Sequence, residues 1–168
     1  DVYRAVTHNK GIMNGIISVA NAVGQDSRAI EAAANAYAAI SGKYRSLSKW
    51  SKDSDGNLVG ILDIPLSVGI VGGIVNVHPV AKVCAKILNV ESAQELACVM
   101  TATGLAQNYS AIRALSTEGI QKGHMRLHAR NLAAAAGATS AQIDKIVEQM
   151  IQTKSISLDN AKKLLRQI

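Results

Sequence analysis

Apolar residues recur every three or four positions through much of the chain, and this spacing predicts a mostly helical fold. The first such segment, residues 10–23, ends at Gly24, a residue suited to the left-handed backbone that closes many helices. Asp26 and Ser27 then supply an N-cap for an alanine-rich segment that runs to about Ser41. The chain is therefore predicted to begin with two helices joined by a short turn.

The middle of the chain changes to the alternating pattern of β-strands. Residues 44–50 and 58–68 alternate, and the polar run 53–56 between them predicts a hairpin turn. Pro65 suits an edge strand or a bulge because it cannot donate a backbone hydrogen bond. The glycine-rich run 69–73 allows close approach of the backbone, but no GK[ST] follows it, so it is weak evidence for a phosphate loop.

Helical spacing then returns and continues to the end of the chain. A helix is predicted from Pro79 to about Asn89, and the capping box at 92–95 precedes a long helix that reaches about Thr117 and forms the spine of the core. Beyond it, three shorter helices are predicted over about 120–136, from 139 or 140, and from 157. The predicted fold class is α+β, a mostly helical domain portion with a β-hairpin (1–120) followed by a small helical flap (121–168).

Composition agrees with a chain that builds a core, because 48% of the residues are hydrophobic and 18% are charged. Cys84 and Cys98 lie in apolar surroundings without CxxC spacing, which favours two buried thiols in a reduced, cytoplasmic protein over a disulfide or a zinc framework. The longest candidate membrane span, 61–77, is interrupted by polar residues, proline and glycines, so no membrane segment is predicted.

Positive charge gathers at the C-terminal end of the chain. The net charge is +6, and from Gln121 onward eight Lys or Arg stand against three Asp or Glu. Such an excess attracts polyanions, including nucleic acid and the phosphates of a ligand, although a solvated helix face is the commoner explanation. A non-catalytic basic module that binds nucleic acid, or an inactive assembly fragment, therefore stays as an alternative function.

The stretch THNKGIMNG at 7–15 holds the first candidate for chemistry. Lys10 and Asn14 stand four residues apart, so on a helix both project from one face, where a ligand carbonyl could sit. From spacing alone, a solvated lysine and a surface amide are at least as good an explanation. Asp26 has a sufficient role as an N-cap, and a role beside Lys10 requires the two-helix hairpin to bring them together.

Histidine and amide side chains supply the remaining candidates. His124 and His128 share a helical face, but Met125 breaks the HExxH pattern and no third ligand is evident, so a metal site is not predicted. His124 is better suited to titrate near neutral pH as an acid. Gln107 and Asn108 interrupt an apolar helix, where buried amides usually satisfy neighbouring backbone and otherwise face a ligand groove.

Six blocks together resemble one family, the 3-hydroxy-3-methylglutaryl-coenzyme A reductases of the class II, bacterial and archaeal type. The blocks follow the family's order and span nearly the whole chain: THNKGIMNG (7–15), GQDSRAIEAAANAY (24–37), GNLVGILDIPL (56–66), GIVGG (69–73), GLAQNYSAIRAL (104–115) and EGIQKGHMRLHARN (118–131). Ile70 replaces the family's usual threonine, and Ala33 and Asn35 replace its usual glycine and histidine, which concerns local packing more than chemistry.

The resemblance implies a role for each matching residue. Lys10, Asp26 and His124 would be catalytic: Lys10 stabilises an oxyanion, Asp26 hydrogen-bonds Lys10, and His124 protonates the coenzyme A thiolate. The implied substrate-binding residues are Arg4, which pairs with the free carboxylate of the substrate, Asn14, which lies near the reacting carbonyl, and a helical wall made of Gln107, Ala111 and Leu115.

The resemblance also implies the reaction and its partners. The family reduces the thioester of (S)-HMG-CoA in two steps to mevalonate and free coenzyme A, using two molecules of NADH or NADPH. No GxGxxG pattern identifies the dinucleotide, and the family's catalytic glutamate and small dinucleotide-binding domain are absent from this chain. The expected partners are the N-terminal portion of the same enzyme and a second subunit in a homodimer, without nucleic acid, membrane or metal.

Overall fold

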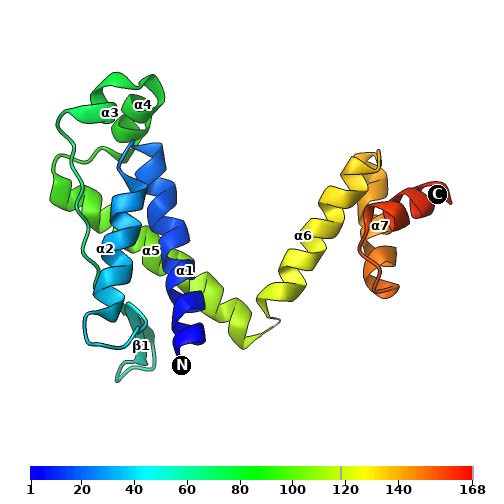
Figure 1. Ribbon diagram of the computed structural model, residues 1–168, viewed down its shortest axis with the longest axis horizontal. Helices are drawn as coiled ribbons and strands as arrows, with labels where there is room; N and C mark the ends of the chain where they lie inside the picture. The colour runs from blue at the N-terminus through cyan, green and yellow to red at the C-terminus, as the bar shows by residue number, and fades with distance from the viewer. Residues whose placement is uncertain (118, 168) are drawn as a thin grey trace. The chain divides into compact units, whose positions relative to one another are not determined.

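The computed structural model describes residues 1–117 and 119–167, apart from the side chain of Lys122, so Glu118 of the last sequence block lies outside the described residues. The chain divides into two compact units, 1–113 and 114–168. Helices predominate and the described strands form one antiparallel hairpin (Figure 1), which confirms the predicted α+β, mostly helical fold. The elements are α1 (Val2–Ala22), α2 (Ser27–Ala39), β1 (Ser48–Lys52), β2 (Leu58–Leu62), α3 (Gly73–Val77), α4 (Pro79–Leu88), α5 (Ala93–Ser116), α6 (Ile120–Ala135), α7 (Ser140–Gln152) and α8 (Leu158–Leu165).

The core of the first unit lies among α1, α2 and α5. Helices α1 and α2 run side by side in opposite directions (Figure 1), joined by a turn in which Gly24 has a φ of +70°. Their apolar faces and that of α5, together with one residue after α1 and one before β1, form one buried cluster, made of Ile12, Met13, Ile16, Ala20, Val23, Ile30, Ala34, Ala38, Leu47, Leu96 and Met100. Burial of these side chains is the main stabilising contribution available to the unit.

Helix α1 begins at Val2, so the predicted start at residue 10 was wrong. The Asp1 carboxylate accepts hydrogen bonds from the backbone N–H groups of Tyr3, at 2.9 Å, and Arg4, at 3.5 Å, and caps the helix. The aspartate was a usable cap signal, but the helical period is hidden because Val2, Tyr3 and Val6 are exposed whereas the polar His8 and Asn9 are buried. As a result, Lys10 lies in the interior of a long helix rather than at its N-terminus.

Glycines allow α1 and α5 to pack backbone against backbone. A Cβ at Gly15 would lie 2.6 Å from the carbonyl oxygen of Thr103, and one at Gly11 would lie 2.8 Å from the Cβ of Ala111. On α5, a Cβ at Gly104 would lie 2.7 Å from the side chain of Ile16. Because real Cβ atoms do not approach so closely, these three positions must lack a side chain for the helices to cross at this distance.

The hairpin is shorter than predicted, although its turn is where the sequence placed it. Strand β1 starts at Ser48 rather than at residue 44, and β2 ends at Leu62 rather than at residue 68. Beyond β2 the residues continue to alternate between exposed and half-buried. Every second side chain packs on the core, namely Ile64, Leu66, Val68 and Ile70. In the described part of the chain this segment has no partner strand, which shows that alternation reports a buried face and not a hydrogen-bonded ladder.

The second unit has its own core. The C-terminal half of α6 packs with α7 and α8 around Ala129, Ala133, Ile146, Val147, Met150, Ala161 and Leu164. Thr139 forms a capping box with Gln142 at the start of α7, and Ser157 caps α8, as the sequence predicts. The assignment of residues 121–168 as a flap stays a prediction.

One further expectation was wrong, and one short helix was not predicted. The expectation of two buried thiols was wrong, because Cys98 is exposed and Cys84 is half-buried, and both are free. The short helix α3 was not predicted, since its five residues follow directly on the glycine-rich run and offer no helical period to read.

Candidate functional site

Lys10 and Asn14 emerge from a helix that is otherwise buried around them. Between His8 and Ile16 every residue of α1 is buried except these two, which are exposed. Their spacing of four residues places both on one face of α1. A cation and an amide therefore share one narrow exposed edge, as the sequence predicts for these two residues.

Helix α5 brings two more predicted residues to the same place. Ala111 packs against Gly11, and the Cβ of Gln107 lies 3.0 Å from where a Cβ at Gly15 would be. Each glycine directly follows Lys10 or Asn14 in α1, so the crossing gathers these four predicted residues. Within the described part of the chain, the side chains of Lys10, Asn14 and Gln107 make no hydrogen bond or ion pair, and their polar groups are available to a ligand.

Arg4 lies on α1, about 9 Å along the helix axis from Lys10. Its side chain is exposed, and a guanidinium nitrogen donates a hydrogen bond of 3.5 Å to the hydroxyl of Ser46. The structure thus keeps a second cation on the helix that carries Lys10.

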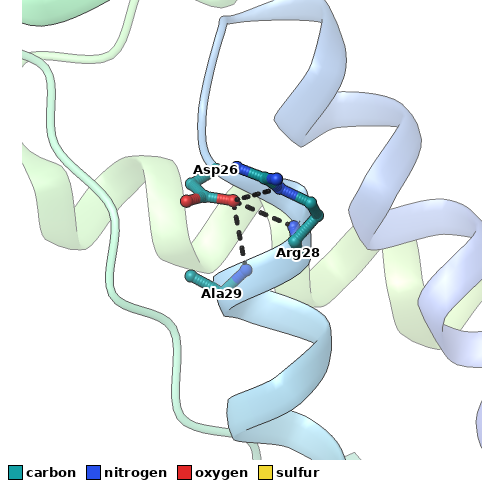
Figure 2. Close-up of polar contacts among 3 residues, drawn as sticks. All are labelled: Asp26, Arg28 and Ala29. Atoms are coloured by element: carbon teal, nitrogen blue, oxygen red, sulfur yellow. Dashed lines mark hydrogen bonds and ion pairs between the residues drawn. The ribbon is translucent and has the colours of Figure 1, made fainter.

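Asp26 acts as the N-cap of α2 (Figure 2). One carboxylate oxygen accepts hydrogen bonds from the backbone N–H groups of Arg28, at 3.1 Å, and Ala29, at 3.2 Å, and lies 3.7 Å from the Arg28 guanidinium. The hydrogen bond from Ala29 is the main cause that holds the pKa of Asp26 below its usual value, and the charge of Arg28 adds to it. The carboxylate is therefore ionised at neutral pH and open to solvent.

The two-helix hairpin does not bring Asp26 to Lys10. The backbone N–H of Gln25 donates to the carbonyl of Ala20 at 2.8 Å, so Asp26 begins α2 beyond the C-terminal end of α1. Ten residues separate Lys10 from Ala20, which is about 15 Å along the axis, and a lysine side chain reaches only about 6 Å. Helical side chains also lean towards the N-terminus, which is away from Asp26. Within one chain the ammonium and this carboxylate do not meet.

A buried polar network that sequence reasoning missed lies behind Lys10. Nε2 of His8 lies 2.6 Å from the Ser48 hydroxyl, which donates to Oδ1 of Asn108 at 2.7 Å. The Trp50 indole N–H donates to the same oxygen at 2.8 Å, and Nδ2 of Asn108 donates to the His8 carbonyl at 3.2 Å. His8, Ser48 and Asn108 are at most 6% exposed. The network ties α1, β1 and α5 together.

Asn9 makes a second buried connection from α1. Its Nδ2 donates to the Arg45 carbonyl at 2.9 Å, and its Oδ1 accepts from the Leu47 N–H at 2.9 Å. Asn9 is 2% exposed. The residues that flank Lys10 are therefore held by the segment that leads into the hairpin. No periodicity signals these contacts, because the partners are about forty residues apart in the sequence.

The remaining predicted residues belong to the second unit. His124 lies on the N-terminal half of α6, where each side chain described from Gln121 to His128 is exposed. Leu115 is 47% exposed, near the C-terminal end of α5. Among the described residues no group of three or more His, Cys, Asp or Glu could hold a metal ion.

One cavity of the first unit lies away from the predicted site residues. A cavity of about 490 Å³ opens at the C-terminal end of α1, between Gln25, Ile70 and Lys86, and none of the predicted site residues lines it. The chemistry predicted for Lys10 is therefore to be sought on the α1/α5 crossing and not in this cavity.

Every helix in the described ranges is too short or too polar to span a membrane.

Comparison with known proteins identifies related chains. The family described as Hydroxymethylglutaryl-coenzyme A reductase matches residues 1–129. The 3-hydroxy-3-methylglutaryl-coenzyme A reductase of Archaeoglobus fulgidus is 55% identical over all of this chain, which covers 38% of that protein. A probable reductase of the same name from Borreliella burgdorferi is 43% identical over 98% of this chain and is covered to 39%.

Solved structures of similar chains carry the same name as these relatives. The 3-hydroxy-3-methylglutaryl-coenzyme A reductase of Streptococcus pneumoniae matches 99% of this chain with a TM-score of 0.67 and 42% identity, and 40% of it is covered. A class II reductase from the same organism, bound to NADPH in open conformations, also has a TM-score of 0.67, at 43% identity over 99% of this chain, with 41% of it covered. This chain spans about two fifths of the length of the relatives it matches.

Proposed function

Because this chain belongs to the hydroxymethylglutaryl-coenzyme A reductase family, we propose that it is the C-terminal portion of an enzyme that interconverts (S)-HMG-CoA and mevalonate plus coenzyme A. The reaction carries two hydrides from NADH or NADPH to one acyl carbon. The thioester first becomes an aldehyde with release of coenzyme A, and the aldehyde then becomes an alcohol. The observation that carries the proposal is the exposed edge of Lys10 and Asn14 on an otherwise buried stretch of α1.

Lys10 supplies the electrostatic part of the reaction. Each hydride transfer places negative charge on the carbonyl oxygen, and an ammonium held at that oxygen stabilises the transition state more than the ground state. Asn14, one helical turn away, offers an amide N–H to the same oxygen. Arg4 pairs with the carboxylate at the other end of the acyl group, and Gln107, Ala111 and Leu115 form the wall along the pantetheine arm.

His124 supplies the proton for the leaving group. An imidazolium is a stronger acid than a thiol, so transfer of a proton from the imidazolium to the thiolate is favourable. In this proposal residues 121–168 act as the flap that carries the histidine and excludes water during the reaction.

Asp26 acts on the lysine of a second subunit. Its separation from Lys10 within one chain supports a homodimer in which the ammonium comes from one copy and the carboxylate from the other. The carboxylate would keep that lysine charged and hold it in place.

The remaining parts of the enzyme lie outside this chain. The relatives are about two and a half times longer, and one of them binds NADPH, so we assign the dinucleotide site and the catalytic glutamate to the portion that this chain does not contain. We place the enzyme in the cytoplasm, as for a class II reductase. The comparisons favour this function over a basic module that binds nucleic acid.

The test is Lys10→Ala in the complete enzyme. Without the ammonium, kcat should fall by at least about 100-fold on both HMG-CoA and the free aldehyde, because both hydride transfers create an oxyanion. Turnover of each substrate is followed by oxidation of NADPH or NADH, and folding is checked by circular dichroism.

His124→Gln is the matched control for this experiment. It should impair the thioester and largely spare the aldehyde, since only the first half-reaction releases a thiolate. Near-normal turnover by a folded Lys10→Ala enzyme would remove Lys10 from the mechanism, and equal losses on both substrates in His124→Gln would remove the histidine from its role as proton donor.

A further inference from the structure

The hydrogen-bond directions in the buried network are determined by its chemistry. The Trp50 indole can only donate, so the atom of Asn108 that faces it is the oxygen. The other end of the amide faces the His8 carbonyl, which can only accept, so it is the NH₂ group. The Ser48 hydroxyl gives its proton to the Asn108 oxygen, and Nε2 of His8 must therefore carry a proton and donate to Ser48. One consistent arrangement of protons satisfies every member.

Contacts of His8, Asn9 and Gly11 hold α1 on two sides of its circumference. Successive helical residues are about 100° apart, so His8 and Gly11 lie within about 60° of each other on one side of α1, Asn9 lies about 100° from His8, and Lys10 points to another side. His8 is bonded to β1, Asn9 to the segment before β1, and Gly11 is pressed against α5. Lys10 takes the one side that remains open.

We propose that the network of His8, Ser48, Trp50 and Asn108 is a positioning device for the Lys10 ammonium, which prevents α1 from rotating about its own axis. The inference rests on the proposed function for its catalytic consequence, but the positioning itself does not. The ammonium lies about 8 Å from the helix axis, so a rotation of about 15° would move it by about 2 Å. Misplacement by about 1 Å can cost about 100-fold in rate.

The experiment replaces Ser48 by alanine in the complete enzyme. The change leaves the His8 N–H without its acceptor and removes one of the two donors to Asn108, while it creates only a small void. Lysines are labelled by reductive ¹³C-methylation, and the Lys10 resonance is assigned by its loss in Lys10→Arg. Ser48→Ala should shift or broaden that resonance.

Turnover is measured on unmethylated samples of the same proteins. We expect kcat to fall about 10- to 100-fold with KM for HMG-CoA changed less than about 3-fold, because the loss acts on the oxyanion and not on the coenzyme A arm. Ser48→Thr keeps the hydroxyl and should restore most of the rate. Ser51→Ala, on the exposed side of the same strand, is the matched control and should leave both the resonance and the rate unchanged.

Two outcomes separate the positioning from the proposed reaction. An unchanged Lys10 resonance in folded Ser48→Ala protein overturns the positioning role, even if the melting temperature falls. A changed resonance in a protein whose unmutated form does not reduce HMG-CoA supports the positioning and contradicts only the reductase function. If Ser48→Ala does not fold, Trp50→Phe removes the other donor to Asn108 and gives the same readout.

Discussion

Adjacent residues of the candidate site differ completely in environment. Gln107 is exposed on the α1/α5 crossing, whereas Asn108, its neighbour, is fully buried and satisfies three partners. The explanation that a buried amide satisfies its neighbours is therefore confirmed for Asn108, whereas the explanation that Gln107 faces a ligand groove stays a prediction. His8 and Lys10 differ in environment in the same way, since the buried histidine connects α1 to the hairpin and the lysine is exposed.

His8 should make stability depend on pH. Burial is the main cause that lowers the pKa of His8 below its usual 6.5, and the charge of Arg4 adds to it. In the unfolded chain His8 titrates near pH 6.5, so its contribution to stability is complete above that pH. As the pH falls further, the unfolded state takes up the proton first, and stability is lost until the folded pKa is passed.

Urea unfolding at a series of pH values measures this effect. The free energy of unfolding should decline below about pH 6.5 with a slope from His8 of at most about 1.4 kcal/mol per pH unit. A His8→Gln variant should be less stable at neutral pH but lose less stability on acidification. Parallel pH profiles for the two proteins would show that His8 is not the responsible group.

The crossing of α1 and α5 is the central feature among the elements. Gly11, Gly15 and Gly104 let the two helices approach until the backbone of one contacts the other. Every residue that the crossing gathers depends on this distance, including Lys10 and Gln107. Glycine within a helix costs about 1 kcal/mol relative to alanine, so its use here is explained by the close approach and not by helix propensity.

Gly15→Ala should therefore destabilise the protein. The new methyl group would meet the Thr103 carbonyl at 2.6 Å, and a backbone atom cannot move aside as a side chain does. The cost of overpacking, about 1–3 kcal/mol, outweighs the gain in helix propensity, and the melting temperature should fall by several degrees.

Gly123→Ala is the opposite case and serves as control. Gly123 lies within α6, and a Cβ there would have no neighbour within 4 Å. This variant should be neutral or more stable by about 0.5–1 kcal/mol in differential scanning calorimetry. A Gly15→Ala protein that melts no lower than the unmutated protein would contradict the close crossing.

For the whole molecule, the separation of Lys10 and Asp26 is the main result. They stand at different levels of the α1/α2 hairpin, too far apart for contact, although the family resemblance implies a hydrogen bond between them. The separation within one chain and the implied hydrogen bond are compatible if the active site takes Lys10 from one copy of the chain and Asp26 from another. This is the structural argument for the proposed homodimer.

Mixing inactive subunits tests this arrangement. Lys10→Ala and Asp26→Asn enzymes are each expected to be inactive, whereas a heterodimer of the two has one site with both residues intact. Random mixing makes about half of the dimers mixed, so activity should return to about a quarter of the unmutated level. The assay follows turnover after the two proteins are unfolded and refolded together.

The same mixture has a clear negative outcome. If lysine and aspartate served one site from the same chain, every site in the heterodimer would lack one of them and no activity would return. Two Lys10→Ala preparations mixed with each other give the baseline.

The sequence by itself determined most of the helices, the caps of α2, α7 and α8, the hairpin turn and the family. These depend on contacts between residues close in the chain, such as the hydrogen bonds from Arg28 and Ala29 to Asp26, or on blocks recognisable as strings. The start of α1 was missed although its cap is local, because in its first turns apolar residues are exposed and polar residues are buried.

The tertiary structure alone decided which polar residues are buried and which are exposed. Ser48 and Asn108 are sixty residues apart, and Asn108 and His8 one hundred, and nothing in the local pattern of either marks the pairing. The two glycines beside Lys10 and Asn14 likewise acquire their meaning only when α5 lies against them. Local hydrogen bonding and periodicity act over one or two turns of helix, whereas the direction of a side chain depends on what packs on the other sides of its helix.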